Sequence, residues 1–194
     1  MYDGTGTVLA SQIDTVNTAG GETLTISGEG SVSLPSVGTN KSITLNTLGI
    51  SDGTSGTIGL ASNYTLDSGS FDITTKPITL SGSRQYDGTT NVASSDLTLI
   101  GQVSGESISI TGTGSVTDKN VGAGKTINTT GLSLADNTSN ASNYSLSTGT
   151  FTINNKILSI SGTRAYDGSN TVSSGNISLN LSLIHISEPT RPSS

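Results

Sequence analysis

The sequence predicts an all-β protein built from tandem repeats, and three observations lead to this prediction. The tripeptide Tyr-Asp-Gly occurs three times, beginning at Tyr2, Tyr86 and Tyr166, so that the copies lie 84 and 80 residues apart. Short runs alternate Ile, Leu or Val with Ser or Thr, which is the period of a half-buried strand. No stretch of useful length shows the spacing of an amphipathic helix.

Other landmarks recur at the same two spacings. Pairs 80 residues apart are Asn63-Tyr64 with Asn143-Tyr144, Phe71 with Phe151, and Lys76 with Lys156. Pairs 84 residues apart are Gly21-Glu22 with Gly105-Glu106, Val37-Gly38 with Val121-Gly122, and Lys41 with Lys125. The difference of four residues places an insertion within residues 51–62. This segment is rich in Gly, Ser and Thr, as expected of a surface loop.

The distinctive residues of the chain are therefore positions of the repeat. All five Tyr and both Phe occupy repeated positions, so we interpret them as core anchors that bury large apolar areas. The structural repeat positions that we predict are Tyr2, Asp3, Gly4, Tyr64, Phe71, Tyr86, Asp87, Gly88, Tyr144, Phe151, Tyr166, Asp167 and Gly168.

The alternating runs predict strands that bury one face and expose the other, as in an antiparallel sandwich. They lie at residues 22–27, 41–45, 70–74, 78–80, 106–111, 150–153 and 157–160. A unit of about 80 residues would hold roughly seven to nine strands, which is the number in an immunoglobulin-like β-sandwich. We therefore predict tandem immunoglobulin-like sandwiches, each with its own small core. A β-helix or another elongated β array remains the alternative.

The repeat spacing divides the chain into four parts. Residues 1–75 form a first repeat that lacks its N-terminal strand, and residues 76–155 form a complete second repeat. Residues 156–180 begin a third, truncated repeat. Residues 181–194 break the pattern and resemble a translated sequencing adapter, so we expect them to be non-native. Because the first repeat lacks a strand, we also expect the native chain to extend upstream.

Composition argues against several classes of function. Only 11% of residues are charged, the net charge is −6 and the isoelectric point is about 4.4, which disfavours a nucleic-acid partner. The chain has no Cys, which excludes disulfides and thiolate chemistry. Its single His, His185, lies in the expected non-native tail. No apolar run is long enough to cross a membrane. We therefore predict no enzyme, and no catalytic, cofactor-binding or metal-binding residue.

Two kinds of motif could carry chemistry, but each has a simpler structural interpretation. The segment 122–126, Gly-Ala-Gly-Lys-Thr, resembles the end of a phosphate-binding loop, yet the first Gly of such a loop would fall at Lys119 and no helix pattern follows. Asp3, Asp87 and Asp167 could bind calcium, but a lone Asp-Gly lacks further oxygen ligands and strongly favours a turn.

Charged residues near the repeated motifs also have structural interpretations. Lys76 and Lys156 could form isopeptide bonds with an Asn, although a strand-edge or linker Lys is the simpler interpretation. Arg84 and Arg164 are expected to pair with the Asp that lies three residues further on.

The ordered set of motifs resembles a known family. It comprises Ile157 to Gly168 with its partner Ile78 to Gly88, Thr117 to Thr126, Gly131 to Leu134, Asn143 to Leu146, and Phe151 to Ile153. Together these segments look like the YDG repeat of very large bacterial surface exoproteins. Such proteins are similar to filamentous haemagglutinin and are typically exported by two-partner secretion. The resemblance covers residues 2 to about 180. The first copy departs from it, with Leu34-Pro35-Ser36 where the second has Asp118-Lys119-Asn120.

The resemblance implies an immunoglobulin-like β module that acts as a stalk or spacer in an adhesin. We therefore expect a non-enzymatic protein that is secreted or displayed on the bacterial cell surface. Its expected partners are neighbouring repeats of the same chain and, through other domains, a host or matrix surface. No nucleic-acid binding, membrane insertion or cofactor is expected. The alternative is an adhesion module that itself binds a glycan or matrix ligand through its loops.

Overall fold

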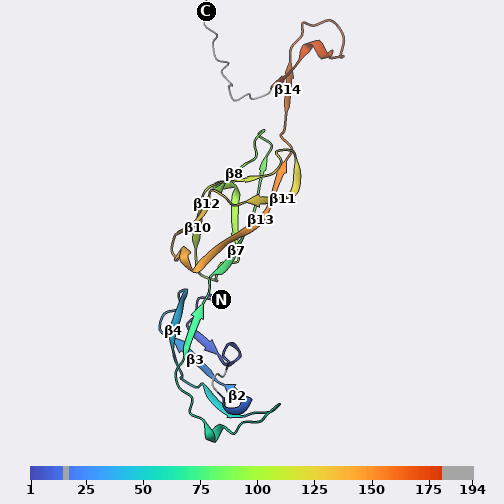
Figure 1. Cartoon of the computed structure of the whole chain (residues 1–194). Coiled ribbons are helices and arrows are strands. Elements are labelled where there is room, and N and C mark those ends of the chain that lie inside the picture. Colours follow the sequence, from blue (N-terminus) through green and yellow to red (C-terminus); the bar gives the residue numbers. More distant parts are fainter. Residues whose placement is uncertain (15–17, 181–194) are drawn as a thin grey trace, which may run out of the picture.

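The structure, a computed structural model, describes residues 1–14 and 18–180. Within these residues all regular elements are β-strands or single turns of 3-10 helix, and none is an α-helix. The prediction of an all-β protein is therefore confirmed. The molecule is an elongated rod: the first repeat lies at one end, the second in the middle and the two-stranded β14–β15 unit at the other end (Figure 1).

The elements that the repeats share occur in the same order. The first contains β1 (Thr7–Leu9), η1 (Ala10–Gln12), η2 (Ala19–Gly21), β2 (Leu24–Ser27), β3 (Glu29–Val32), β4 (Gly38–Thr44), β5 (Gly49–Asp52), η3 (Ala61–Asn63) and β6 (Ser70–Ile73). The second contains β7 (Lys76–Gln85), β8 (Asn91–Ala93), η4 (Ser94–Asp96), β9 (Leu97–Ile100), β10 (Ile108–Val116), β11 (Gly122–Asn128), β12 (Leu132–Asp136), η5 (Ala141–Asn143) and β13 (Tyr144–Asn154). The third contains β14 (Ser159–Gly162), η6 (Ser174–Asn176) and β15 (Ile177–Asn180).

The second repeat is one seven-stranded sheet that nearly closes into a barrel. Its strands follow the order β12-β10-β11-β13-β7-β9, and β8 pairs with β10 outside this path. The first and last strands of the repeat, β7 and β13, pair in parallel from Lys76 opposite Tyr144 to Gln85 opposite Asn154. The other pairs are antiparallel. The parallel pair therefore joins the two ends of the repeat.

A glycine lets β10 change partners along its length. Residues Ile108–Gly112 pair with β12, whereas Thr113–Ser115 pair with β8. Gly112 has a φ of +91°, and a Cβ at this position would collide with the carbonyl oxygen of Gly131. Gly28 is its counterpart, with a φ of +87°, and it separates β2 from β3 in the first repeat. Both repeats thus bend the same strand at a glycine.

The core of the second repeat lies inside the curved sheet. Ile78 and Leu80, alternate residues of β7, are 0% and 1% exposed. Phe151 of β13 is also 0% exposed and packs in the same cluster as Leu80. The remaining buried members of this cluster are Val92, Val116, Ile127, Leu132 and Ile153. The alternation of the sequence is therefore realised as inward and outward faces of one sheet.

The first repeat is a half-barrel. It contains a four-stranded sheet of order β1-β3-β4-β6 and a separate β2–β5 pair. These pairings repeat those of the second repeat, because β4–β6 corresponds to β11–β13 and β2–β5 to β10–β12. Within the described residues, however, no strand pairs with β6 on the side where β7 pairs with β13. Residues 64–69, which correspond to the first half of β13, form no strand.

The structure does not show tandem immunoglobulin-like sandwiches. Such a sandwich consists of two antiparallel sheets packed face to face, whereas the second repeat is one continuous sheet with a parallel pair. The mostly antiparallel pairing also differs from the parallel coils of a β-helix. Alternation reports only that one face of each strand is buried. It does not distinguish a sheet closed on itself from two stacked sheets.

The third repeat consists of a single strand pair. β14 pairs with β15 in the register of β7 with β9, since Gly162 lies opposite Ile177 as Gly82 lies opposite Leu97. Tyr166, predicted as a core anchor, is 96% exposed because no barrel surrounds it. The segment 181–194, expected to be non-native, lies outside the described residues.

The sheet of the second repeat is nearly closed and that of the first is half closed, so equivalent substitutions in the two repeats should lower the free energy of unfolding by different amounts. Replacing Phe151 with Ala should lower the free energy of unfolding of the second repeat by about 3–5 kcal/mol, because the side chain is fully buried. Phe71→Ala is the matched control and should cost less, since Phe71 is only partly buried in the half-barrel. Urea unfolding followed by circular dichroism would measure both. A loss below about 1 kcal/mol for Phe151→Ala would show that this ring does not anchor the core.

Candidate functional site: the junction between repeats

The residues that mark the repeat meet where the first repeat joins the second. We call this contact the junction and define it by Tyr2 and Gly4 from the first repeat and by Val103, Glu106, Asn143 and Tyr144 from the second. The two repeats are connected by only Thr74 and Thr75, which lie between β6 and β7. So short a connection forces the ends of the repeats together.

Backbone pairing brings Tyr2 to this position. Its amide donates a hydrogen bond to the carbonyl oxygen of Thr74, with a distance of 2.7 Å. The N-terminus therefore lies near the middle of the rod, beside the start of β7 (Figure 1). Tyr86 repeats the arrangement, because its amide donates to the carbonyl oxygen of Asn154 at 2.8 Å. The first two Tyr-Asp-Gly motifs are thus held where the chain leaves their repeats.

One carboxylate joins two tyrosines across the junction. Glu106 Oε1 accepts a hydrogen bond from the Tyr2 hydroxyl, and Glu106 Oε2 accepts one from the Tyr144 hydroxyl. The two rings pack edge to face, with centroids 5.6 Å apart and planes at 81°. Both tyrosines are buried. The hydrogen bonds to a charged acceptor give this apolar contact a defined geometry.

The surroundings of these hydroxyls keep them protonated. Burial, and then the hydrogen bond to Glu106, raises the pKa of Tyr2 to about 12. Burial and the same carboxylate also raise the pKa of Tyr144 above its ordinary value. Both residues therefore remain hydrogen-bond donors throughout the physiological pH range.

Backbone contacts complete the junction. Asn143 Oδ1 accepts a hydrogen bond of 3.0 Å from the amide of Val37, which lies in the first repeat. Gly4 has a φ of +84°, and a Cβ at this position would lie 2.8 Å from Val103 Cγ1. The Gly of this motif is thus favoured both by its backbone conformation and by its close approach to the next repeat.

The hydrophobic core continues across the junction. Tyr2, Val8, Val32 and Ile73 of the first repeat pack in one cluster with Ile78, Ile108 and Tyr144 of the second. The sequence suggested that each repeat buries a core of its own. The structure shows such a core within the second repeat and, in addition, a cluster that the two repeats share where they meet.

Each repeat builds half of this contact by itself. In the first repeat, the Tyr64 hydroxyl donates to Glu22 Oε2 at 2.6 Å and accepts from the amide of Ala19 at 3.0 Å. These contacts correspond to those of Tyr144 with Glu106 and with the amide of Val103. A Glu–Tyr pair is therefore present at one end of both the first and the second repeat. In the second repeat this pair binds the tyrosine of the preceding Tyr-Asp-Gly motif. Within the described residues, Tyr64 and Glu22 have no such third member.

Glu22 and Glu106 recur at equivalent positions of the repeat, but the sequence analysis predicts no role for either residue. Their signal was available, because a charged residue that recurs at a repeat position is unusual in a chain with so few charges. Recurrence alone does not reveal whether a residue contacts its own repeat or the next one. The link between Glu106 and Tyr2 spans 104 positions and became visible only in the fold.

The Asp of each Tyr-Asp-Gly motif forms a turn, as predicted. Asp87 Oδ1 accepts hydrogen bonds from the amide of Thr89 at 2.8 Å and from its hydroxyl at 2.9 Å. Asp3 makes the same two contacts with Thr5. Burial opposes ionisation of Asp87, but the hydrogen bonds from Thr89 and the charge of Arg84 outweigh it and lower the pKa of Asp87. Gly88 follows with a φ of +85°.

The predicted Arg–Asp pairs are also confirmed. Arg84 NH1 lies 2.5 Å from Asp87 Oδ1, and Arg164 NH1 lies 3.1 Å from Asp167. The Arg84 guanidinium donates further hydrogen bonds to the carbonyl oxygens of Thr89 and Asn91. It therefore ties the turn to β8. This use of several donors in a fixed fork is typical of Arg.

The segment that resembles a phosphate-binding loop lies in a strand. Residues 122–126 belong to β11, where the register shifts between Gly122 and Lys125 and Gly124 has a φ of +70°. Asn40 adopts the same left-handed conformation in the matching bulge of the first repeat. A hydrogen bond from Lys125 lowers the pKa of Asp118, whose Oδ2 lies 2.7 Å from Lys125 Nζ. The glycines therefore shape a β-bulge.

The described part of the chain contains neither a metal-binding cluster nor a membrane-spanning helix. No group of three or more His, Cys, Asp or Glu side chains lies close enough together to hold a metal ion. No helix there has the length and apolar character needed to cross a membrane. Lys76 is the first residue of β7 and lies opposite Tyr144, and β7 is an inner strand of the sheet rather than an edge strand.

Comparison with known families identifies the second repeat. Residues 73–152 match the model of the YDG domain family. These residues form a YDG domain. No curated protein and no solved structure matches the chain. The matched range runs from the last residue of β6 to Thr152, two residues before the end of β13, so the YDG domain coincides with the nearly closed barrel.

The raised pKa of Tyr2 predicts a pH-dependent contribution to stability. Because the folded pKa of about 12 exceeds the unfolded value of about 10, the hydrogen bond to Glu106 contributes fully below pH 10 and is lost as the pH rises toward 12. Wild type should melt at a higher temperature than Tyr2→Phe near neutral pH, and the difference should shrink above pH 10. Tyr166→Phe is the control, since this ring is exposed. A constant difference across the pH series would contradict the role of this hydroxyl.

Proposed function

We propose that this chain is a set of structural stalk or spacer repeats from a secreted or cell-surface bacterial adhesin-like exoprotein. The proposal rests on the contacts that the most distinctive residues of the repeat make with one another. Tyr2, Glu106 and Tyr144 bind one another across the junction, so the motif that recurs in the sequence joins one repeat to the next. A module whose most specific residues recognise its neighbour is suited to building length.

The geometry of the YDG domain supports this role. The parallel pairing of β7 with β13 carries the chain into one end of the domain and out of the other. The two-residue connection and the shared core then leave little freedom for one repeat to swing relative to the next. Repeats joined in this way would extend a rod by a fixed length for each added copy.

Two further observations support the extracellular setting. The match to the YDG domain agrees with the resemblance of the repeats to those of large bacterial surface exoproteins. The absence of Cys suits a chain that crosses membranes unfolded before it folds outside the cell. The proposed partners are the neighbouring repeats, with contact to a host or matrix surface made by other domains.

A second candidate function is an adhesion module that binds a glycan or matrix ligand. The insertion loop of the first repeat favours it, because Ile58 and Leu60 are exposed there and the second repeat has no equivalent. Exposed apolar side chains on a loop can serve as contacts for a ligand.

Small-angle X-ray scattering would test the spacer function. An extra copy of residues 76–155, inserted after Asn155 of the full chain, should lengthen the rod, and a second extra copy should add the same increment. Equal increments are expected because every added copy should make an identical junction. A compact particle or unequal increments would contradict the spacer proposal.

Two matched variants would test whether the junction stiffens the rod. Glu106→Ala removes the carboxylate that joins Tyr2 to Tyr144, and should shorten or broaden the distribution of interatomic distances. Glu22→Ala removes the equivalent carboxylate where no preceding tyrosine is bound, and should leave that distribution unchanged. Indistinguishable scattering from both variants and wild type would show that the junction does not hold the repeats in line.

A glycan array would separate the two candidate functions. A spacer should bind no class of glycan reproducibly. Binding that is lost when Ile58 and Leu60 are both replaced by Ser would instead support the adhesion module.

A further inference from the structure

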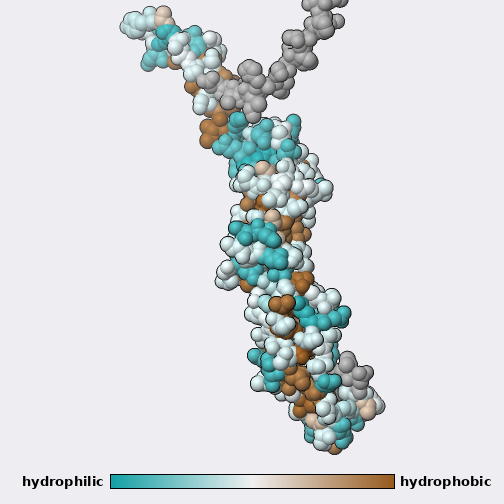
Figure 2. Space-filling model, turned by 90° about the vertical axis from the view of Figure 1, so that its left-hand side faces the viewer, coloured by the Kyte–Doolittle hydropathy of each residue, from teal (hydrophilic) through white to brown (hydrophobic). Residues whose placement is uncertain are grey.

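The junction brings two tyrosine rings into contact. Tyr2 and Tyr144 form the only pair of aromatic rings that pack together in the described part of the chain, with centroids 5.6 Å apart and planes at 81°. One ring comes from the first repeat and the other from the second. On the face drawn in Figure 2, these two repeats are packed against each other without a gap. The ring pair is therefore part of a close contact between two modules.

The hydroxyl ends of the two rings converge. Tyr2 donates a hydrogen bond to Oε1 of Glu106, and Tyr144 donates one to Oε2 of the same carboxylate. The two oxygens are bonded to one carbon atom, so the hydroxyls that they hold lie close together. On each ring the Cε atoms lie next to the carbon that carries the hydroxyl. These are the atoms through which two tyrosyl radicals join to form dityrosine.

Glu106 is placed to accept the protons that such an oxidation releases. A tyrosine that loses an electron becomes a strong acid, and its phenolic proton moves to the base that accepts its hydrogen bond. The raised pKa values of Tyr2 and Tyr144 mean that neither hydroxyl ionises at neutral pH, so oxidation there requires a proton acceptor. The Glu106 carboxylate is half-buried, and protons that reach it can therefore pass on to water.

The composition of the chain favours oxidation at tyrosine. The chain has no Cys and no Trp, and its single Met is Met1. It therefore lacks the thiols and indoles that would otherwise donate an electron to a tyrosyl radical. Tyr2 and Tyr144 are only 4% and 5% exposed, which shields a radical on either ring from reductants dissolved in water. The neighbouring ring is then the closest reaction partner.

We propose that Tyr2 and Tyr144 form an intramolecular dityrosine bond that fastens the first repeat to the second. The oxidant is hydrogen peroxide, acting through a haem peroxidase. Each ring gives up one electron and its phenolic proton, and the two radicals join by a bond between one Cε atom of each ring. The hydrogens on these two carbons move as protons to the phenolic oxygens, which restores both aromatic rings and both hydroxyls. One peroxide takes up the two electrons and the two phenolic protons and becomes two molecules of water.

The bond gives a chain without cysteine a covalent link between repeats. It ties Tyr2, which precedes every strand of the first repeat, to Tyr144 at the start of β13. Like a disulfide, it restricts the unfolded chain and so favours the folded state. The extracellular setting in which the chain meets peroxide rests on the proposed function, whereas the bond itself requires only the junction.

The first repeat contains a matched contact that lacks a second ring. Tyr64 donates to Glu22 as Tyr144 donates to Glu106. Within the described residues, no other aromatic ring packs against Tyr64. Its carboxylate can accept a proton, but a radical on Tyr64 has no neighbouring ring to join. Tyr64 is therefore a control for the requirement for two rings.

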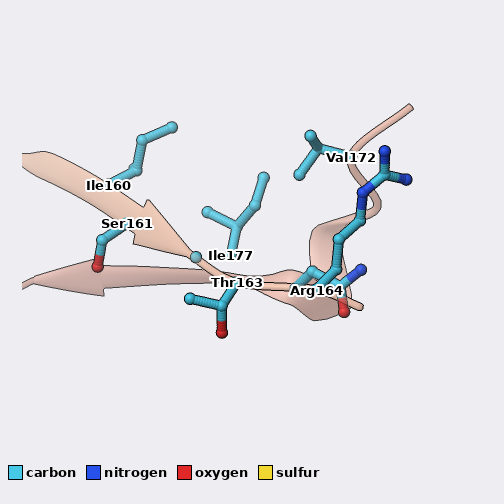
Figure 3. A pocket seen from close by; sticks show the side chains of 8 residues that line it. Ile160, Ser161, Thr163, Arg164, Val172 and Ile177 are labelled. Carbon is cyan, nitrogen blue, oxygen red and sulfur yellow. The ribbon is translucent and has the colours of Figure 1, made fainter. Parts of the chain in front are cut away.

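Tyr166 is the tyrosine most accessible to an oxidant. Its ring is 96% exposed. It follows β14, and Figure 3 shows the apolar side chains of Ile160 and Ile177 uncovered on one side of the β14–β15 pair. No other ring of the described residues packs against Tyr166, so its radical is expected to link separate molecules. Tyr166→Phe is therefore the parent protein for the test.

Peptide mapping of the oxidised full chain would test the proposal. Trypsin places each of the five tyrosines in a different peptide, with Tyr2 in residues 1–41 and Tyr144 in residues 126–156. Dilute Tyr166→Phe protein treated with hydrogen peroxide and a haem peroxidase should yield monomers in which these two peptides are joined. The joined pair should have lost two hydrogen atoms and show dityrosine fluorescence, and the melting temperature of the protein should rise. Monomers without this pair, or dityrosine confined to other peptides, would overturn the proposal.

Three further variants, each made in the parent protein, test the roles of the individual groups. Tyr2→Phe keeps the ring but lacks the phenol, so it should give no joined pair and no rise in melting temperature. Tyr64→Phe should cross-link as the parent does. Glu106→Gln keeps an acceptor oxygen but loses the base, and should slow formation of the joined pair by about 100-fold. Circular dichroism before oxidation checks that each variant is folded. A rate in Glu106→Gln equal to that of the parent would overturn the role of this carboxylate, and a rise in melting temperature of oxidised Tyr2→Phe would overturn the role of the bond.

Discussion

The parallel pairing between β7 and β13 is the interaction on which the rest of the structure depends. It joins the strand that begins the YDG domain to the strand that ends it, and so brings the curved sheet close to closure. It also sets the direction of the chain. Since both strands run the same way, the polypeptide enters at one end and leaves at the other. The tyrosine that follows β7 is thereby held beside the exit of β13, where the next repeat begins.

The first repeat shows what happens without this pairing. Its strands β1 to β6 make nearly the same contacts as their counterparts, yet the sheet stops half closed. Phe71 remains partly exposed where Phe151 is fully buried. Residues 64–69 stay irregular where the equivalent part of β13 is extended. The absence of a strand equivalent to β7 accounts for these differences. In the second repeat β7 supplies the edge that pairs with β13 and the two buried side chains of Ile78 and Leu80.

The sequence predicted the long strands well and the topology poorly. Alternation located β2, β4, β6, β7, β10, β13 and β14, because apolar and polar side chains alternate along these strands. It missed β11, whose first half is glycine-rich and bulged. It also missed the shorter strands β1, β3, β5, β8, β9, β12 and β15, which have three to five residues each. Closure of the sheet depends on which strands pair with one another, and the alternation of apolar and polar residues along a strand does not indicate its pairing partner. For the same reason the repeat pattern identified Tyr2, Glu106 and Tyr144 as framework residues but did not assign them to a contact between repeats.

The position of β7 and β13 also governs how the YDG domain responds to a pull along the rod. Tension applied through the neighbouring repeats acts at Lys76 and at Asn154, at opposite ends of two strands that lie side by side. The strands are then sheared past each other, so the hydrogen bonds between them resist together rather than opening one after another from an end. Rupture under such tension is limited by the rate of unfolding rather than by equilibrium stability. A domain closed by its first and last strands is therefore held most firmly along the axis on which a tethered rod is stretched.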